Sequence, residues 1–252
     1  MPRVLVFPSG TLPPNPMHSR AKTRFAPLAL TVVLVGLMTA SSIAAVTVYK
    51  NDFSSREDVK EVKKSGGKNC KRKLKSKKGK GKKKGKSAMS AIVEQGPAEC
   101  LFRLPVQGDA PLPDHDLKAN GKVSKSVAKS VRKSAFLVVE ARSGGDGVGY
   151  ALRVFPHTGR FELTRGPGGA EFPVRGTDEA IQGVGKRNSL RLVVDGTQVR
   201  ALVNGREVAQ VSDPDPGEVN GTKVRFGLGN ERGTGKDVSG TFSKVTVGVP
   251  EP

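Results

Sequence analysis

The sequence predicts an all-β protein, a two-sheet antiparallel sandwich that follows one N-terminal transmembrane or signal helix. Short runs of alternating apolar and polar residues recur between residues 134 and 248. Turn-forming residues separate these runs, and the chain holds 31 Gly. No convincing amphipathic helix follows the N-terminal apolar stretch. Alternation with period two and frequent tight turns favour short antiparallel strands, so the 252 residues suit one β domain behind a targeting segment.

Residues 1–25 are expected to form a cytoplasmic or disordered basic N-terminus. The first sixteen residues are rich in proline, whereas Met17 begins a more conventional leader, so Met1 and Met17 both stay open as the start. Arg20, Lys22 and Arg24 precede the apolar stretch with no acid nearby. By the positive-inside rule, this end stays in the cytoplasm and the rest of the chain is exported.

Residues 26–49 carry no charged side chain and are predicted to be a transmembrane anchor or the apolar region of a signal peptide. As a helix, residues 28–48 would span roughly 30 Å, which matches a bilayer core. A small-x-small cleavage site ends at Ala44. We therefore expect a single-pass membrane protein with an extracytoplasmic C-terminal domain, or a secreted protein if the chain is cut after Ala44.

The next residues, 50–65, are polar and mixed in charge, and we expect a tether or a first strand there. Residues 66–250 form the predicted sandwich. Within it, Cys70–Ser76 and residues 87–95 are predicted strands of a hairpin, and a lysine-rich insert at 77–86 forms its tip. Residues 100–107 and 116–124 are the next predicted strands.

Between Val62 and Val93 the chain has fourteen Lys or Arg and no Asp or Glu, which supplies most of its net charge of +20. Like charges at this density stay solvated, so the insert is predicted to contact an anionic cell-envelope polymer or lipid headgroups. The alternative is a solvated tip that only keeps the protein soluble. Nucleic acid fits the charge but conflicts with export and with the lack of stacking aromatic residues. The residues predicted to bind the polyanion are Lys77, Lys78, Lys80, Lys82, Lys83, Lys84 and Lys86.

The chain has two cysteines, Cys70 and Cys100, one on each side of the insert. Because the region lies beyond a membrane-targeting segment, we expect them to form a disulfide; two thiols in a reducing compartment are the alternative. Closing this loop would stabilise the fold by about 3–4 kcal/mol in the chain-entropy model.

From residue 134 the predicted strands alternate clearly. Asp195-Gly196 and Asn204-Gly205 are two-residue hairpin turns, since each Gly accepts a positive φ, so three consecutive strands form a meander. The predicted strands are SAFLVVEA, VGYALRVF, GRFELTR, SLRLVVD, TQVRALVN, REVAQVS, KVRFGLG and TFSKVTVG.

The run YALRVFPHTGRFELTR, followed by NSLRLVVDGTQVRALVNGREVAQVSD, KVRFGLG and TFSKVTVGV, resembles the concanavalin A-like lectin/glucanase jelly roll in its laminin-G or keto-disaccharide-hydrolase-like branch. The resemblance covers about residues 51–249. It implies a two-sheet antiparallel sandwich that commonly binds sugars or proteins, in which a strand near Asn51-Asp52-Phe53 pairs with the last strand. A shared fold does not by itself give the function. The basic insert departs from the family pattern.

No catalytic residue is predicted. Glucanases of this fold cleave with carboxylates on one strand in an ExDxE or ExDxxE arrangement, and the sandwich has no such motif. The nearest acidic run, at residues 57–61, lacks the spacing. Two Ser-x-x-Lys matches, at Ser126 and Ser130, lack the companion motifs of penicillin-binding enzymes and are interpreted as part of a solvated edge strand or loop.

No metal site and no cofactor are predicted. The acidic segment at residues 213–218 supplies alternate carboxylates, but two prolines stiffen it and the central Asp-Gly of a calcium loop is missing, so we interpret it as a polar turn. The three histidines, His18, His115 and His157, are scattered along the chain and give neither a metal cluster nor a base with a partner.

These observations predict a non-catalytic extracytoplasmic binding protein. Its sandwich would dock a glycan or a protein, and its lysine-rich loop would contact the anionic polymer or lipid. The alternative is an extracellular glycoside hydrolase or lyase with an unrecognised site. Two carboxylates about 5–10 Å apart on the concave sheet face would support that alternative.

Overall fold

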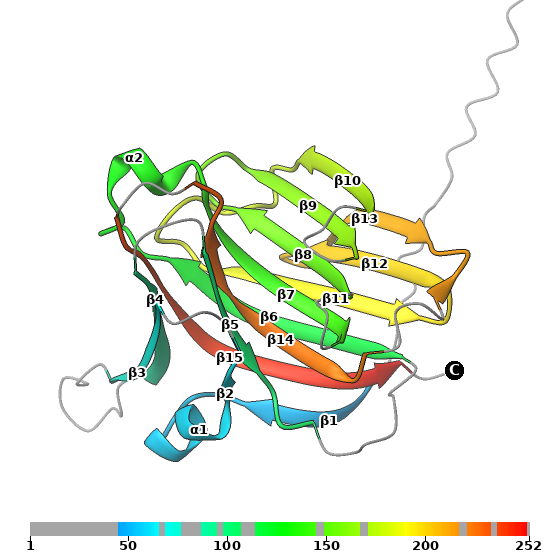
Figure 1. The fold of residues 1–252 in the computed structure, drawn as a ribbon, viewed down its shortest axis with the longest axis horizontal. Coiled ribbons are helices and arrows are strands. Elements are labelled where there is room, and N and C mark those ends of the chain that lie inside the picture. The colour runs from blue at the N-terminus through cyan, green and yellow to red at the C-terminus, as the bar shows by residue number, and fades with distance from the viewer. Residues whose placement is uncertain are drawn as a thin grey trace, which may run out of the picture. The chain divides into compact units, whose positions relative to one another are not determined.

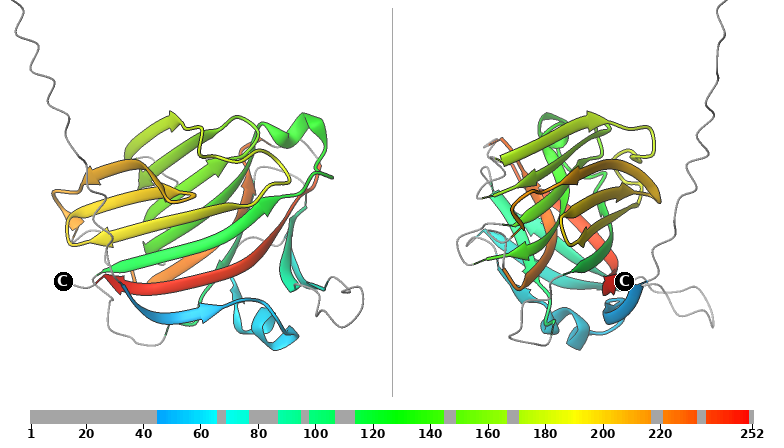
Figure 2. Two further views of the ribbon diagram at one scale, coloured as in Figure 1. Left: turned by 180° about the vertical axis from the view of Figure 1, so that it is seen from behind. Right: turned by 90° about the vertical axis from the view of Figure 1, so that its right-hand side faces the viewer.

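The computed structural model describes residues 45–65, 69–76, 87–94, 98–106, 114–144, 149–166, 171–216, 221–232 and 236–250. The chain divides into two compact units, Met1–Ser41 and Ser42–Pro252. The first lies outside the described residues. The second is a sandwich of two antiparallel sheets (Figures 1 and 2), which confirms the predicted fold class.

The eight-stranded sheet, called sheet A here, has the order β13-β12-β11-β6-β15-β4-β3, and β1 also pairs with β15. All its pairings are antiparallel. Its strands are β1 (Ala45–Asn51), β3 (Cys70–Ser76), β4 (Ser87–Val93), β6 (His115–Val123), β11 (Asn188–Asp195), β12 (Gln198–Val203), β13 (Arg206–Ser212) and β15 (Val238–Pro250).

The seven-stranded sheet, called sheet B, has the order β10-β9-β8-β7-β14-β5-β2 and is also antiparallel. Figure 1 shows it stacked on sheet A. Its strands are β2 (Lys63–Lys64), β5 (Ala98–Arg103), β7 (Ala135–Ser143), β8 (Tyr150–Phe155), β9 (Arg160–Arg165), β10 (Glu171–Thr177) and β14 (Lys223–Asn230).

The predicted meander is confirmed. Strands β11, β12 and β13 pair in sequence, and φ is 54° at Gly196, 53° at Asn204 and 89° at Gly205. Each predicted strand from residue 134 onward has its counterpart in the structure. The sequence does not predict β10, because Pro173 and Gly176 lower its strand propensity; β10 lies at the edge of sheet B, where a strand proline is tolerated.

The first strand begins at a position that differs from the predicted boundary between the apolar stretch and the sandwich. Strand β1 begins at Ala45, inside the apolar stretch expected to span residues 28–48 and before the tether or first strand expected at 50–65. Its β-branched residues pair with the end of β15, so Val46 lies opposite Val249 and Asn51 opposite Val245. Apolar content alone does not separate such a strand from the end of a membrane helix. Residues 28–44 lie outside the described residues, and no helix within the described ranges is long and apolar enough to cross a membrane.

Two short helices lie within the β domain, although the sequence predicts no helix there. Helix α1 (Arg56–Glu61) begins at a capping box between Ser55 and Asp58, in place of the expected tether. Helix α2 (Lys129–Arg132) is one turn within the predicted solvated Ser/Lys segment. Val127 before this turn and Val131 within it are buried in the core, so this segment is only partly solvated.

Phenylalanines from both sheets fill the centre of the core. Phe226 on β14 packs against Phe242 on β15 with ring centroids 4.9 Å apart, and against Phe102 and Phe53 at 5.7 and 5.9 Å. Phe53 is fully buried just after β1. The expected pairing of the first strand with the last is confirmed, because β1 pairs with β15.

The predicted disulfide between Cys70 and Cys100 is present. Cys70 lies on β3 at the edge of sheet A, and Cys100 lies on β5 of sheet B. The bond therefore fastens the two sheets to each other beside the hairpin that carries the basic insert.

Candidate functional site

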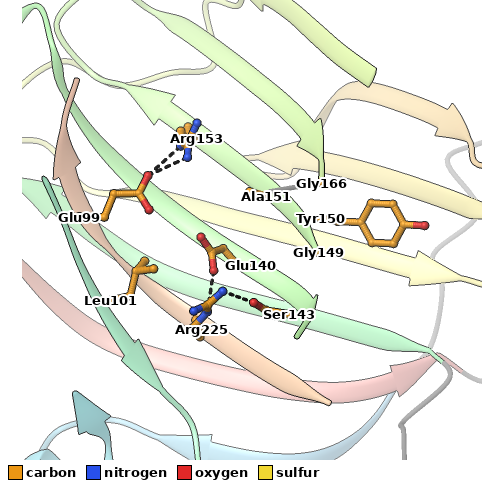
Figure 3. Close-up of a pocket in the computed structure, with 10 residues that line it drawn as sticks. All are labelled: Glu99, Leu101, Glu140, Ser143, Gly149, Tyr150, Ala151, Arg153, Gly166 and Arg225. Carbon is orange, nitrogen blue, oxygen red and sulfur yellow. Dashed lines mark hydrogen bonds and ion pairs between the residues drawn. The ribbon is translucent and has the colours of Figure 1, made fainter. Parts of the chain in front are cut away.

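A pocket lies on the outer face of sheet B, over the four neighbouring strands β8, β7, β14 and β5 (Figure 3). Its cavity measures about 210 Å³. Four charged side chains line it together with small residues of β8 and its neighbouring loops. The charged residues are Glu99, Glu140, Arg153 and Arg225.

Strand alternation places these side chains on one face. On β7, Leu137, Val139 and Ala141 enter the core, so Glu140 points outward. Glu140 is in register with Arg225 on β14 and with Ala151 on β8. Ala151 has a small side chain, which leaves open space beside the Glu140 carboxylate.

Two ion pairs hold the charged groups in place. Arg225 Nε lies 2.7 Å from Glu140 Oε2, and the same guanidinium donates a hydrogen bond to Ser143 Oγ. Arg153 Nη2 lies 2.8 Å from Glu99 Oε1. All four charged side chains are at least two-thirds buried. The pocket therefore presents fixed donors and acceptors with no net charge.

The Glu140 carboxyl is buried, and burial raises its pKa above the usual range. The Arg225 guanidinium opposes this shift, while the negative charge of Glu99 adds to it. The two carboxylates therefore influence each other within one pocket. Glu140 can act as a proton donor at a higher pH than an ordinary glutamate does.

Aromatic rings lie next to the pocket under arginine side chains. Arg153 lies 5.4 Å from the centroid of Phe136, and Arg160 lies 3.9 Å from that of Phe155. Phe136 and Phe155 are almost fully buried. A ligand on this face would meet guanidinium planes before it met aromatic rings.

Tyr150 belongs to the core side of the pocket wall. Its ring points away from the four charged groups (Figure 3), and its hydroxyl donates a hydrogen bond to Asp213. Arg165 Nε lies 3.1 Å from the same carboxylate, which also accepts the backbone N–H of Asp215. Asp213 thus fastens the acidic segment to sheet B, which supports the interpretation of that segment as a polar turn.

The predicted polyanion-binding lysines, from Lys77 to Lys86, lie outside the described residues. Strands β3 and β4 pair up to Ser76 opposite Ser87, so the insert connects the ends of a hairpin, as predicted. The structure does not bring Ser126 to Lys129 as a nucleophile and base; Ser126 Oγ lies 2.8 Å from Ser124 Oγ. The acids at residues 57–61 have structural roles, since Asp58 caps α1 and Glu61 accepts hydrogen bonds from Tyr49 and Asn51.

The sequence does not identify the four charged pocket residues. Glu99 and Arg153 are 54 residues apart in the chain, and Glu140 and Arg225 come from strands that only the sheet order makes neighbours. One signal is present in the sequence: Glu140 is an acid in the otherwise apolar run AFLVVEA. An acidic residue that points outward from an otherwise apolar predicted strand, as Glu140 does, indicates a candidate site.

Comparison with known protein families finds no match for this sequence. No curated protein matches it either. Solved structures do share its fold.

A Bacillus subtilis protein with a galectin-like fold has 12% identity and a TM-score of 0.53, over 82% of this chain and 98% of that one. The catalytic domain of an endo-1,3-β-glucanase (laminarinase) from Thermotoga petrophila RKU-1 has 10% identity and a TM-score of 0.51, over 83% and 100%. A carbohydrate esterase from the Shiga toxin-encoding bacteriophage phi24B has 14% identity and a TM-score of 0.51, over 82% and 100%. The domain is a concanavalin A-like jelly-roll sandwich.

Proposed function

We propose that this protein binds a glycan in the pocket on the outer face of sheet B, as a non-catalytic extracytoplasmic protein. The observation that carries the proposal is the set of four buried charged groups from four adjacent strands around one cavity. The cavity of about 210 Å³ suits one part of a small polar ligand better than the broad face of a protein.

The chemistry of the pocket suits sugar hydroxyl groups. A guanidinium donates two parallel hydrogen bonds and a carboxylate accepts two, which matches neighbouring hydroxyls on a sugar ring. Because Arg153 is held by Glu99 and Arg225 by Glu140, these groups are in position before the ligand arrives. Such preorganisation lowers the entropy lost on binding.

The solved structures of the same fold support this class of ligand. The laminarinase is named for a glucan, and the bacteriophage protein is named as a carbohydrate esterase. Both names connect the fold with carbohydrate, so sugars are the ligands to test first.

The proposal includes the basic insert and the location of the protein. The lysines from Lys77 to Lys86 contact an anionic envelope polymer or lipid headgroups, because their charge attracts phosphates and carboxylates. The domain lies outside the cytoplasm, anchored by the apolar stretch or released after Ala44. Cleavage at that point leaves β1 intact, since the strand begins at Ala45.

The test is glycan binding by the full chain, screened on an array and measured by calorimetry. We expect E99Q/R153Q to lower the affinity by about tenfold or more, because it removes both charges of one pocket ion pair and the paired donors of the guanidinium. The control is R206A/E179A, which removes an exposed ion pair far from the pocket lining. Equal affinity of the pocket variant and the control would contradict the site.

A second candidate function is glycoside cleavage, which the raised pKa of Glu140 beside Glu99 favours. In that reaction a protonated carboxyl donates to the leaving oxygen, and a second carboxylate acts as base or nucleophile. The variant E140Q would then abolish product release while it keeps glycan binding. Failure of the wild-type protein to release reducing ends or unsaturated sugars from the glycans it binds would exclude this candidate.

A further inference from the structure

Figure 2 (left) shows the molecule from the side of sheet A. The outer face of this sheet, on the opposite side of the core from the pocket, carries a second concentration of charge. We call it the lysine face. Its lysines come from β1, β3, β6 and β15 and alternate with core residues of the same strands. They are Lys50, Lys73, Lys75, Lys118, Lys122 and Lys244.

The strand register arranges these lysines in rows across the sheet. In one row Lys50 lies opposite Thr246, which lies opposite Lys118. In another row, Lys73 is followed by Ser90, Thr241 and Lys122 on successive strands. Each row thus begins and ends in a lysine and has hydroxyl side chains between. With strands about 4.8 Å apart, the two lysines of a row are roughly 10 and 14 Å apart.

The lysines of this face are not neutralised by nearby acids. Other cations on the same face have partners: Lys71 pairs with Glu94, and Arg191 pairs with Asp116. None of the six lysines pairs with a carboxylate among the residues that the structure describes. Because like charges repel, such a face is stabilised when a polyanion lies against it.

The lysine face includes the strand that precedes the basic insert in the sequence. Lys73 and Lys75 lie on β3, which ends at Ser76, and the insert with its seven lysines follows directly. On the face itself, the partly exposed hydroxyl groups of Thr241 and Thr246 can donate to phosphate or carboxylate oxygens.

We infer that the lysine face binds an extended linear polyanion, which runs across β6, β15 and β4. This inference rests on the polyanion part of the proposed function and adds a surface to it. A linear polymer fits better than a bilayer, because the rows between the lysines present hydroxyl groups rather than apolar groups that could insert into lipid. The exposed large apolar residues of the described chain, Val46 and Val48, precede Lys50 on β1, so neither lies between the two lysines of a row.

Binding of long-chain inorganic polyphosphate to the full-length protein in neutral detergent, across a salt series, tests the inference. We expect the face variant K50S/K118S/K122S/K244S to lose about tenfold in affinity, and its salt dependence to become shallower by about three in log–log slope. The control K129S/K133S/K186S/K236S removes the same charge from exposed positions elsewhere and should change affinity by less than about twofold. Arginine at the four face positions should restore binding, because it restores the charge.

The remaining outcomes separate the two proposals. If the face variant binds polyphosphate like the control, the inference about the lysine face is wrong. Loss of binding in K82S/K83S/K84S/K86S would then still support the proposed role of the insert. Absence of wild-type binding overturns both, and the glycan pocket is unaffected. Stronger binding to phosphatidylglycerol vesicles than to polyphosphate overturns the choice of a polymer.

Discussion

Histidine 115 is an ionisable side chain in the core of the sandwich. It is fully buried at the start of β6, and neither ring nitrogen has a hydrogen-bond partner among the described residues. Burial and the nearby Arg142 cation lower its pKa, Asp114 opposes the shift, and the net result is a decrease from 6.5 to about 4. The imidazole is therefore neutral in the folded protein at neutral pH.

His115 makes the stability of the domain sensitive to acid. Between pH 6.5 and about 4 the unfolded chain binds a proton at this position and the folded chain does not. The free energy of unfolding therefore falls as the pH is lowered through this window, by about 3 kcal/mol in total. Urea unfolding at a series of pH values measures the loss.

Two variants test whether His115 causes this loss of unfolding free energy at low pH. His115→Leu is of similar size and cannot bind a proton, so its unfolding free energy should vary less between pH 6.5 and 4. His157→Gln changes an exposed histidine and should keep the wild-type loss. If His115→Leu showed the full wild-type loss, the proton would have to bind elsewhere.

At the scale of elements, the edge formed by β3, β4 and β5 depends on a covalent bond between sheets. Strand β3 has sheet neighbours on one side only. It carries lysines on its outer face, and repulsion from the adjoining insert opposes its docking. The disulfide between Cys70 and Cys100 holds this strand to sheet B.

Removing the disulfide should destabilise the whole sandwich. For C70S/C100S we expect a loss of about 3–4 kcal/mol in the free energy of unfolding, since the bond closes a loop of intermediate length. Urea unfolding of the wild-type protein with and without reducing agent gives the matched comparison. An unfolding free energy within about 1 kcal/mol of the oxidised protein would show that β3 docks without the bond.

The strands were more predictable from the sequence than their boundaries. Alternation and Gly-containing turns identify β11, β12 and β13, because local φ preferences and one buried face determine them. The start of β1 was not predictable from composition, since Val46 to Tyr49 continues an apolar stretch. Helix α1 has six residues and its stability comes from a capping box and one buried valine, so periodicity does not reveal it.

The candidate site required the sheet order, which the sequence does not contain. Each predicted strand shows which residues point outward, and Glu140 stands out among apolar neighbours. Its partner Arg225 becomes apparent only when β14 is placed between β7 and β5. Tertiary pairing of distant segments, rather than local propensity, decides which charges meet.

In the whole molecule, the two proposed binding surfaces face away from each other. The pocket opens on the outer face of sheet B, the lysine face covers the outer face of sheet A, and one core lies between them. Packed sheets lie about 10 Å apart, and side chains extend further on both sides. The separation exceeds the Debye length of about 8 Å at physiological salt.

This arrangement predicts that glycan and polyanion bind at the same time and independently. The affinity for glycan should change by less than about twofold when polyphosphate saturates the protein, and the reverse should hold equally, because coupling between two sites is reciprocal. Calorimetric titration of glycan into the protein, with and without polyphosphate, measures the coupling. The variant E99Q/R153Q serves as the matched control, since it should lose glycan and keep polyphosphate. Competition between the two ligands would mean that they share a surface, and it would place the polyanion at the pocket arginines rather than on sheet A.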